Sequence, residues 1–301
     1  MSKTILNRSF LFAPGNHARR VEKAFTLAAD AVILDLEDAV AESEKSAARP
    51  MVREALARPR AGRGYVRVNA MGTPWCFRDL VEVVGKGVDG IVLPKVESAA
   101  DLHAIDWLVA SLEREQGLEV GAIDLMPLIE TAAGIQRIDR ILQARSLRPY
   151  SGRWRVRRVA FGAGDYAHDL GLSPTLDEDE LADARARLVL ASRGAGLEAP
   201  VDSPWFHLKE SAAFERAVAR SRRTGFQGRL CIHPDQVPVV NRAFAPTAAE
   251  VASAARIVEA FTEAEARGLA AIQVDGQMID YPIVSQARKV LEAAKLAGVQ
   301  A

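Results

Sequence analysis

The sequence has few cysteines and few aromatic residues, and its charges balance. Its two cysteines, Cys76 and Cys231, are far apart and belong to no Cys-x-x-Cys or Cys/His pattern, which argues against a disulfide framework and a structural zinc site. Aromatic residues make up 6% of the chain, too few for a base-stacking surface. The 39 basic and 39 acidic residues give zero net charge, so no overall field attracts nucleic acid or an anionic membrane.

Long hydrophobic runs are absent as well. No stretch reaches the roughly 18 consecutive apolar residues that a membrane span needs, and residues 1–10 hold no apolar signal-peptide core. We therefore expect a cytoplasmic protein in a reducing compartment, with neither a membrane nor a nucleic acid as its partner.

What the chain does have is a repeated alternation of short apolar runs with amphipathic, alanine-rich stretches. Apolar residues make up 49% of the 301 residues, enough for a full core. Eight strands are predicted at Ser9–Ala13, Ala31–Leu36, Tyr65–Asn69, Gly90–Pro94, Asp124–Ile129, Arg157–Gly162, Ala199–Ser203 and Arg229–Ile232. The clearest helical patterns cover His17–Ala29, Glu44–Ala57, Ala99–Glu115, Asp179–Arg193 and Leu208–Arg223.

Eight strand–helix units predict an α/β fold, a (β/α)8 TIM barrel, over residues 1–245. A doubly wound open sheet is the alternative, but no Gly-x-Gly-x-x-Gly follows the first strand. Residues 246–301 are expected to form a C-terminal helical extension, with a helix over Ala248–Ala266, a turn over Gly276–Pro282 and a helix over Pro282–Leu296. This tail has too little core to be independent, so it should pack on the barrel or on a neighbouring subunit.

Active sites of such barrels form at the C-terminal ends of the strands, and polar residues follow most of the predicted strands. Glu130 and Asp165 are the best metal candidates, because two hard carboxylates without cysteine or paired histidine suit Mg²⁺. Alternatively, both are acids of a helix first turn, stabilised by the helix dipole. Lys95 and Gly164, which also end strands, are candidates for substrate binding.

Charged residues in or beside the second and third strands have two interpretations. Arg67 is either a buried ion-pair partner or a clamp for a carboxylate or an enolate. Glu37 and Asp38 follow Asp35 so closely that an arginine or a metal should compensate their charges. Capping of the following helix remains an alternative for Asp38.

Two further basic features have a structural and a functional interpretation. Asn16 precedes a helix start that contains Arg19, Arg20 and Lys23, and open N–H groups beside cations could bind the phosphates of a nucleotide-bearing substrate. A solvated helix face is the alternative. The arginine-dense stretch over residues 145–158 is expected to be a solvated loop at the bottom of the barrel rather than a polyanion site.

Several motifs together resemble the citrate lyase β-subunit family. They run in order along nearly the whole chain: Arg8–Asn16, Ala29–Val40, Val66–Asn69, Leu93–Glu97, Leu128–Ala132, Phe161–Asp165 and Ile232–Pro234. The resemblance implies a Mg²⁺-dependent carbon–carbon lyase that cleaves citryl-, malyl- or citramalyl-CoA to a 2-oxo acid and an acyl-CoA. It also implies a homo-oligomer, often a trimer.

The resemblance also implies roles for individual residues. Glu130 and Asp165 would ligate Mg²⁺, and Arg67 would bind the substrate carboxylate and the enolate oxygen. Asp280, in a Met-Ile-Asp motif, would reach a neighbour's active site as the general acid/base, with Glu37 and Asp38 as the other candidates.

Two departures and two alternatives remain open. Asp38 stands where related aldolases of free keto-deoxy acids carry histidine, which argues against that branch. Residues 204–209 read Pro-Trp-Phe-His-Leu-Lys where the family often has an acidic segment, so the true acid substrate is undetermined. The alternatives are a thioesterase of malyl- or citramalyl-CoA, in which Asp280 activates water, and a β subunit that works only inside a citrate lyase complex.

Overall fold

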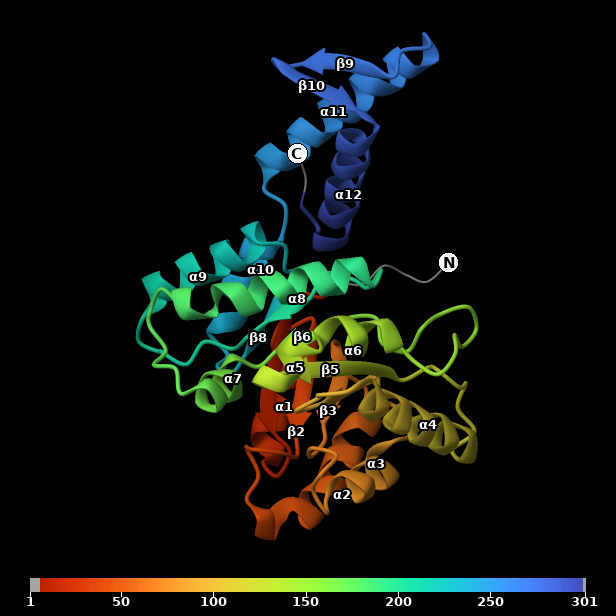
Figure 1. Ribbon diagram of the computed structural model, residues 1–301, viewed down its shortest axis with the longest axis vertical. Helices are drawn as coiled ribbons and strands as arrows, with labels where there is room; N and C mark the ends of the chain where they lie inside the picture. Colours follow the sequence, from red (N-terminus) through yellow and green to blue (C-terminus); the bar gives the residue numbers. More distant parts are fainter. Residues whose placement is uncertain (1–5, 300–301) are drawn as a thin grey trace. The chain divides into compact units, whose positions relative to one another are not determined.

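The computed structural model, which describes residues 6–299, contains a closed barrel of eight parallel strands (Figure 1). The strands are β1 (Ser9–Pro14), β2 (Ala31–Asp35), β3 (Arg63–Arg67), β4 (Gly90–Leu93), β5 (Asp124–Ile129), β6 (Ala160–Phe161), β7 (Val201–Asp202) and β8 (Gly228–Cys231). Each pairs in parallel with the next, and β8 closes on β1. The predicted (β/α)8 barrel is confirmed. Residues 1–5 and 300–301, at the outer ends of the two expected domains, lie outside the described residues.

Alternate residues of the strands fill the inside of the barrel. Ala31 and Ile33 of β2, and Met126 and Leu128 of β5, belong to one core cluster of buried residues, as the two-residue period of a strand requires. Leu34 of β2 points the other way and is buried as well. Burial on both faces explains the continuous apolar runs in the sequence.

Helices occupy the segments between the strands. They are α1 (Ala18–Thr26), α2 (Lys45–Ala57), α3 (Cys76–Val83), α4 (Ala99–Glu115), α5 (Ala132–Gln136), α6 (Ile138–Ala144), α7 (Ala163–Leu170), α8 (Ala182–Gly194), α9 (Ser211–Arg223) and α10 (Gln236–Phe244), with short 3₁₀ turns at Glu42–Glu44 and Asp179–Leu181. Among residues 6–299, no helix combines the length and the apolarity needed to cross a membrane.

Two predicted strands are much shorter than expected. β6 covers only Ala160–Phe161 and β7 only Val201–Asp202, and the two strands pair through a single register, Ala160 with Val201. The residues that precede β6 still accept backbone hydrogen bonds from the segments on either side: Arg157 O accepts the N–H of Glu198 and Val159 O accepts the N–H of Val201, both at 2.9 Å. Their side chains are engaged as well. Arg158, for example, donates to Asp124 and Glu198.

The arginine-dense stretch was expected to be solvated, which is wrong for two of its members. Arg155 and Arg158 are each 2% exposed. Arg155 donates to Asp106 and to both carboxylate oxygens of Glu113, at 2.9 and 2.7 Å, on helix α4. Such pairs hold an outer helix against the barrel, because a buried guanidinium must be matched by buried carboxylates.

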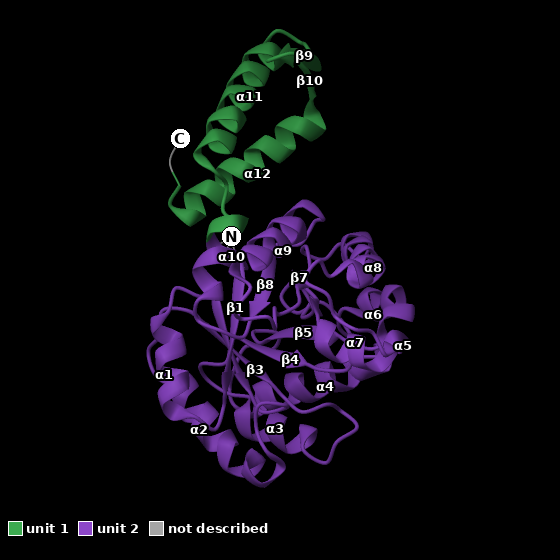
Figure 2. Cartoon of the chain, turned by 90° about the vertical axis from the view of Figure 1, so that its left-hand side faces the viewer, with its two compact units in different colours: residues 1–6, 242–301 green, residues 7–241 purple. Residues whose placement is uncertain are grey.

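The chain divides into two compact units, which Figure 2 colours separately. Residues 7–241 form the barrel unit and residues 242–301 belong to the second, so the division falls inside α10 and not after residue 245. The second unit contains α11 (Ala248–Ala266), the antiparallel strands β9 (Ala271–Val274) and β10 (Gln277–Asp280), and α12 (Tyr281–Ala297). It is therefore not purely helical.

The turn predicted over Gly276–Pro282 is wrong in position. Asp275 and Gly276, both with positive φ (49° and 80°), form the turn of a β-hairpin, and residues 277–280 are strand. An Asp-Gly pair between two alternating apolar runs is a strong hairpin signal. The hairpin and its two helices share a small core of Phe261, Ile279 and Val284.

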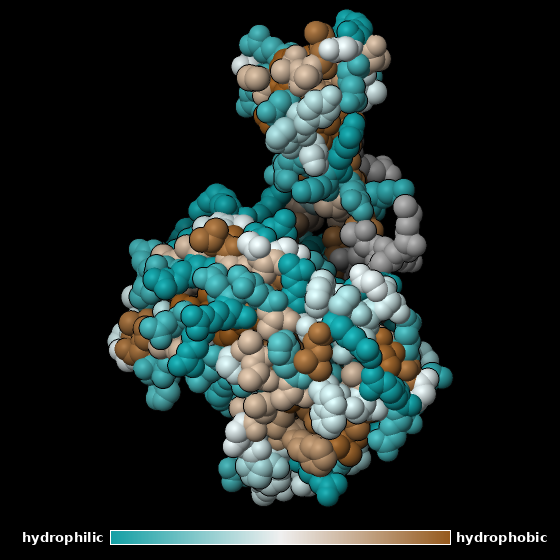
Figure 3. All heavy atoms as spheres, turned by 45° about the vertical axis from the view of Figure 1, so that its right-hand side comes forward, coloured by the Kyte–Doolittle hydropathy of each residue, from teal (hydrophilic) through white to brown (hydrophobic). Residues whose placement is uncertain are grey.

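Exposed apolar side chains lie in separate patches. On the face shown in Figure 3, hydrophobic side chains of the barrel are interspersed with hydrophilic ones. One patch, formed by Met71, Phe77 and Trp107, which are 43%, 57% and 62% exposed, belongs to a groove lined by α3 and α4.

Candidate active site

A cavity of about 750 Å³ opens at the carboxyl ends of the barrel strands. Residues from seven strand ends line it: Pro14 of β1, Asp35 of β2, Arg67 of β3, Glu130 after β5, Gly162 after β6, Pro204 after β7 and Ile232 after β8. Its volume is in the range of pockets that bind cofactor-sized molecules. Its location is the one at which TIM barrels carry out their chemistry.

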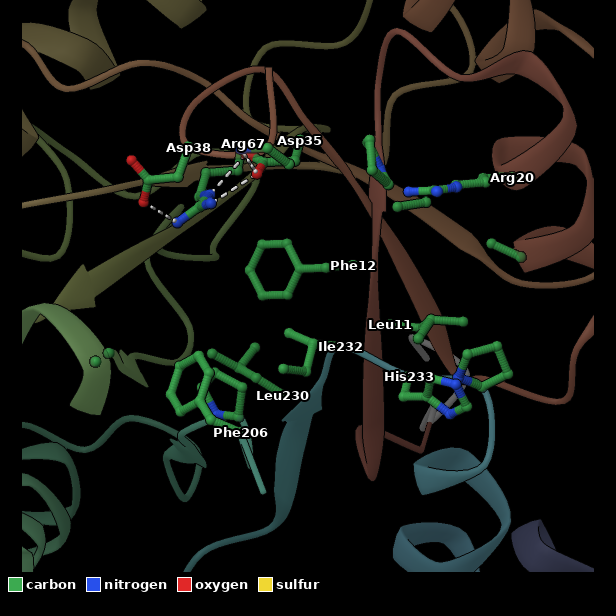
Figure 4. A pocket seen from close by; sticks show the side chains of 18 of the residues that line it. Leu11, Phe12, Arg20, Asp35, Asp38, Arg67, Phe206, Leu230, Ile232 and His233 are labelled. Atoms are coloured by element: carbon green, nitrogen blue, oxygen red, sulfur yellow. Dashed lines mark hydrogen bonds and ion pairs between the residues drawn. The ribbon is translucent and has the colours of Figure 1, made fainter. Parts of the chain in front are cut away.

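The cavity has a charged side and an apolar side. In Figure 4, Arg67, Asp35 and Asp38 lie together on one side of the Phe12 ring. Phe206, Leu230 and Ile232 lie on another side of the same ring, and all of these residues line the cavity. A ligand that fills the cavity therefore meets charged groups at one part of its surface and apolar groups at another.

Arg67 is the centre of the charged side. Its Nε and Nη2 donate to the two oxygens of Asp35 at 2.7 and 2.6 Å, while Nη1 lies 2.8 Å from Glu37 and 3.5 Å from Asp38. Burial alone would raise the pKa of Asp35, but the Arg67 guanidinium and the backbone N–H groups of Glu37 and Ala39 together keep that pKa below its ordinary value. Both interpretations of Arg67 fit this geometry: the residue is a buried ion-pair partner, and it also faces the cavity.

Glu37 is 5% exposed and sits between two cations. Lys95 Nζ donates to its Oε1 at 2.9 Å, and Arg67 Nη1 pairs with its Oε2. Burial raises the pKa of Glu37 above its ordinary value despite these cations. Asp38, by contrast, has a side chain that is 58% exposed and lies at the cavity wall.

Glu130 is the more buried of the two predicted metal ligands, with 2% exposure. The backbone N–H of Lys95 donates to its Oε1 at 2.8 Å, and a Cβ at position 162 would collide with its carboxyl group, so only glycine leaves room there. Burial, and then the negative charge of Glu37, raise the pKa of Glu130 well above its ordinary value. Nearby Asp165 raises it further, so a cation between the two acids would stabilise their charged forms.

These residues fit a magnesium ion. Asp165 lies in the first turn of α7 and shares the cavity with Glu130, so both the metal and the helix-dipole interpretations agree with its position. Among residues 6–299, no group of three or more His, Cys, Asp or Glu side chains is arranged to hold one ion. Mg²⁺ is commonly bound by one or two carboxylates, with waters and substrate oxygens as the other ligands.

Substituting Gly162 with alanine tests this fit. The added Cβ must displace the Glu130 carboxyl group, so we expect Mg²⁺ affinity, measured by isothermal titration, to fall roughly 10- to 100-fold, as when the support of a ligand is lost. Gly194→Ala is the matched control, because a Cβ there meets nothing within 4 Å. Equal affinities in Gly162→Ala and wild type would refute the role of Gly162.

The predicted phosphate site is only partly assembled. Arg20 and Lys23 of α1 line the cavity, but Asn16 does not, because its side chain donates to Glu44 at 2.5 Å. His233 lies in the cavity wall, across Phe12 from Arg67 in Figure 4. In Figure 4, Arg20 lies apart from Asp38.

Asp280 belongs to the second compact unit. It ends β10 and caps α12, with its Oδ1 accepting the N–H of Ile283 at 3.3 Å. A capping role by itself is a sufficient structural reason for an aspartate here, so a role in catalysis remains a prediction.

Sequence reasoning missed most of the apolar wall. Phe12 lies two residues after Phe10, which is in the barrel core, so strand alternation places Phe12 on the inner face near the mouth. Phe206 belongs to residues 204–209, whose difference from the family pattern indicates a changed loop but not an apolar wall. Its ring lies beside Gly164, where a Cβ would be 3.0 Å from its Cζ; no sequence period predicts that contact.

Comparisons with known proteins agree with this geometry. Residues 8–234 match the HpcH/HpaI aldolase/citrate lyase family. The citrate lyase subunit beta of Escherichia coli K12 is 37% identical, over 99% of this chain and 96% of that protein. The L-malyl-CoA/beta-methylmalyl-CoA lyase of Rhodobacter capsulatus is 34% identical, over 98% and 96%.

Among solved structures, CitE from Mycobacterium tuberculosis in complex with magnesium, acetoacetate and coenzyme A superposes with a TM-score of 0.76. It is 30% identical, and the match covers 96% of this chain and 98% of that one. The family match, the full-length relatives and the barrel fold all point to the same family. The chain therefore belongs to the HpcH/HpaI aldolase/citrate lyase family and is a lyase.

Proposed function

We propose that the protein is a Mg²⁺-dependent carbon–carbon lyase that cleaves a 3-hydroxyacyl-CoA of the citryl-, malyl- or citramalyl-CoA type to a 2-oxo acid and an acyl-CoA. The observation that carries the proposal is the pair Glu130 and Asp165, at neighbouring strand ends, in one cavity with Arg67. Relatives named as a citrate lyase subunit and a malyl-CoA lyase support the substrate class, as does CitE with magnesium and coenzyme A bound.

Glu130 and Asp165 would hold the metal. When bound, Mg²⁺ would act as a Lewis acid that favours loss of the hydroxyl proton and draws charge from the adjacent carboxylate. Gly162 leaves the space that the Glu130 carboxylate occupies, and the Lys95 N–H orients that carboxylate.

The acids of the cavity would move the proton. A carboxylate, which is Asp38 in the cavity wall, Glu37 beside it or Asp280 of a neighbouring subunit, takes the proton of the substrate hydroxyl group. The bond between the hydroxyl-bearing carbon and the carbon next to the thioester then breaks. Its electron pair passes to the acyl-CoA fragment as an enolate, which regains a proton to give the acyl-CoA.

Arg67 would stabilise the negative charge that develops in this step. Asp35 fixes its guanidinium through two hydrogen bonds, and the long 3.5 Å contact to Asp38 is the one that a substrate oxygen would replace. A donor that is already oriented toward developing charge is typically worth roughly 3–4 kcal/mol.

The coenzyme would bind along α1. Arg20 and Lys23 project from this helix into the cavity wall, on the same helix face as Ala24 and Leu27, and cations beside an apolar surface suit a phosphate-bearing cofactor. The acyl end would then reach the charged side near Arg67.

Product analysis tests the proposal. The purified chain, incubated with malyl- or citramalyl-CoA and Mg²⁺, should release acetyl-CoA and a 2-oxo acid. Release of free CoA with an intact hydroxy acid would instead show a thioesterase. No turnover by the purified chain, with turnover restored by acyl-carrier and transferase subunits, would show a β subunit of a citrate lyase complex, the alternative that its citrate lyase relative favours.

We further propose that Asp280 completes the active site of a neighbouring subunit in a homotrimer or a multiple of one. Apolar side chains beside it, Met278 and Tyr281, are 68% and 53% exposed within the chain, which supports a surface that another subunit covers. Analytical ultracentrifugation measures the oligomeric state.

Mixed oligomers test the sharing of sites. Asp280→Asn, which retains a good helix cap, and Arg67→Ala should each be inactive alone. After subunit exchange at equal amounts, we expect about a quarter of wild-type activity, because each shared site draws at random on two chains of a symmetric oligomer. No recovery, with exchange confirmed by mass spectrometry, would show that each site is built from one chain.

A further inference from the structure

Lys95, directly after β4, has an unusual backbone conformation. Its φ is +51°, in the left-handed region that residues other than glycine rarely adopt. Such a conformation persists only where the surroundings impose it, and it is frequent at functional sites. At Lys95 the surroundings are two carboxylates of the candidate active site.

This one residue contacts both carboxylates through different groups. Its backbone N–H donates to Glu130 Oε1 at 2.8 Å, and its side-chain ammonium donates to Glu37 Oε1 at 2.9 Å. The Lys95 side chain is 37% exposed, whereas the side chain of its partner Glu37 is 7% exposed. A partly solvated ammonium group therefore binds a buried carboxylate.

Apart from Lys95, the Glu37 carboxylate has one cationic partner among residues 6–299, Arg67. Its Oε2 lies 2.8 Å from Arg67 Nη1 in an ion pair, but this buried oxygen accepts no aligned hydrogen bond. Glu37 is close enough to Glu130 for its charge to act on that carboxyl group. Even so, these acids are not arranged as a three-carboxylate group that could hold one ion.

We propose that Lys95 is a positioning residue that keeps Glu37 out of the coordination sphere of the cation and leaves Glu130 and Asp165 as its two protein ligands. The inference rests on the proposed metal site. Its consequence is chemical: a third carboxylate would occupy a position that a substrate hydroxyl or carboxylate oxygen needs, because Mg²⁺ accepts only six ligands.

The number of waters bound to the cation measures this arrangement directly. Eu³⁺ is a hard cation, and its luminescence decay in H₂O and in D₂O counts the waters on it; displacement by Mg²⁺ verifies that both ions occupy one site. Affinity alone would not decide, because removing a positive charge strengthens cation binding through the field whether or not Glu37 becomes a ligand.

In Lys95→Met, which loses the ammonium, Glu37 should turn to the ion, and we expect one or two fewer bound waters than in wild type. The double variant Lys95→Met/Glu37→Gln should restore the wild-type number, since an amide is a poor substitute for the carboxylate. Lys95→Arg, which keeps a cation near Glu37, is the matched control and should retain the wild-type number.

Lys95→Gly is a second variant, because glycine adopts a positive φ without strain and keeps the N–H that Glu130 accepts. Eu³⁺ bound to Lys95→Gly should carry one or two fewer waters than Eu³⁺ bound to wild type, as expected for Lys95→Met. An unchanged water count in both single variants, or a loss that persists in the double variant, would overturn the role of Lys95. Equal Eu³⁺ binding by wild type and Glu130→Gln would instead overturn the metal site itself, and the inference with it.

Discussion

Replacing Glu130 with glutamine is expected to lower kcat/KM by about 10³-fold or more, because the change removes a charged metal ligand and the electrostatic stabilisation that depends on it. Glutamine has nearly the same shape and can still accept the Lys95 N–H, so the fold should be preserved. Steady-state kinetics with saturating Mg²⁺ measures the loss of activity, and isothermal titration measures the accompanying loss of Mg²⁺ affinity.

Glu54→Gln is the matched control for this substitution. Glu54 lies on α2, its side chain is 70% exposed and it pairs with Arg58, the residue that caps the end of that helix. The kinetics of Glu54→Gln should therefore stay within a factor of about two of wild type, as exposed pairs contribute little. A Glu130→Gln variant with wild-type Mg²⁺ affinity and turnover would show that Glu130 is a structural acid and would remove the basis of the proposed function.

Arg155→Met is expected to lower the free energy of unfolding of the barrel by about 3–5 kcal/mol, the cost of leaving buried charges without their partner. The side chains of Arg155, Asp106 and Glu113 are all 0% exposed. Methionine fills part of the same space, but Asp106 and Glu113 keep charges that water cannot reach. Urea unfolding followed by circular dichroism gives the free energy from the midpoint and the slope.

Arg157→Met is the control, because it removes an arginine that is not fully buried. Arg157 is two residues away and 36% exposed in its side chain, and its partner Asp124 retains Arg158 and Tyr65. We expect a cost below about 1 kcal/mol there. Similar midpoints for Arg155→Met and wild type would mean that the buried pairs do not stabilise the barrel.

The order of elements and the location of the site could be predicted because both depend on local patterns. Continuous apolar runs such as residues 31–34 identify strands that are buried on both faces, and the barrel topology places every strand end at one mouth. Glu130 and Arg67 could therefore be placed in one cavity without knowing the distance between the two side chains.

What could not be predicted depends on contacts between distant segments. Nothing in the spacing of Arg155 identifies Asp106 and Glu113 as its partners, which lie 49 and 42 residues away. Lys95 adopts a left-handed conformation that local propensity disfavours, and it contacts two carboxylates that follow β2 and β5. The hairpin at Asp275 and Gly276 is different, because its sequence signal was present.

In the two-sided cavity, the groups proposed to react with the substrate and the apolar groups proposed to select it come from different strands, so selection can change one set without the other. In the proposed reaction, Arg67 comes from β3, and Glu130 and Asp165 come from the segments after β5 and β6. Phe12, Phe206 and Ile232 come from β1 and from the segments after β7 and β8. If the proposed reaction holds, substitutions of these three apolar residues would alter which acyl or oxo-acid side chain is accepted and leave Arg67, Glu130 and Asp165 in place. Duplicated copies of such a gene can therefore diverge in substrate while each retains the ancestral reaction.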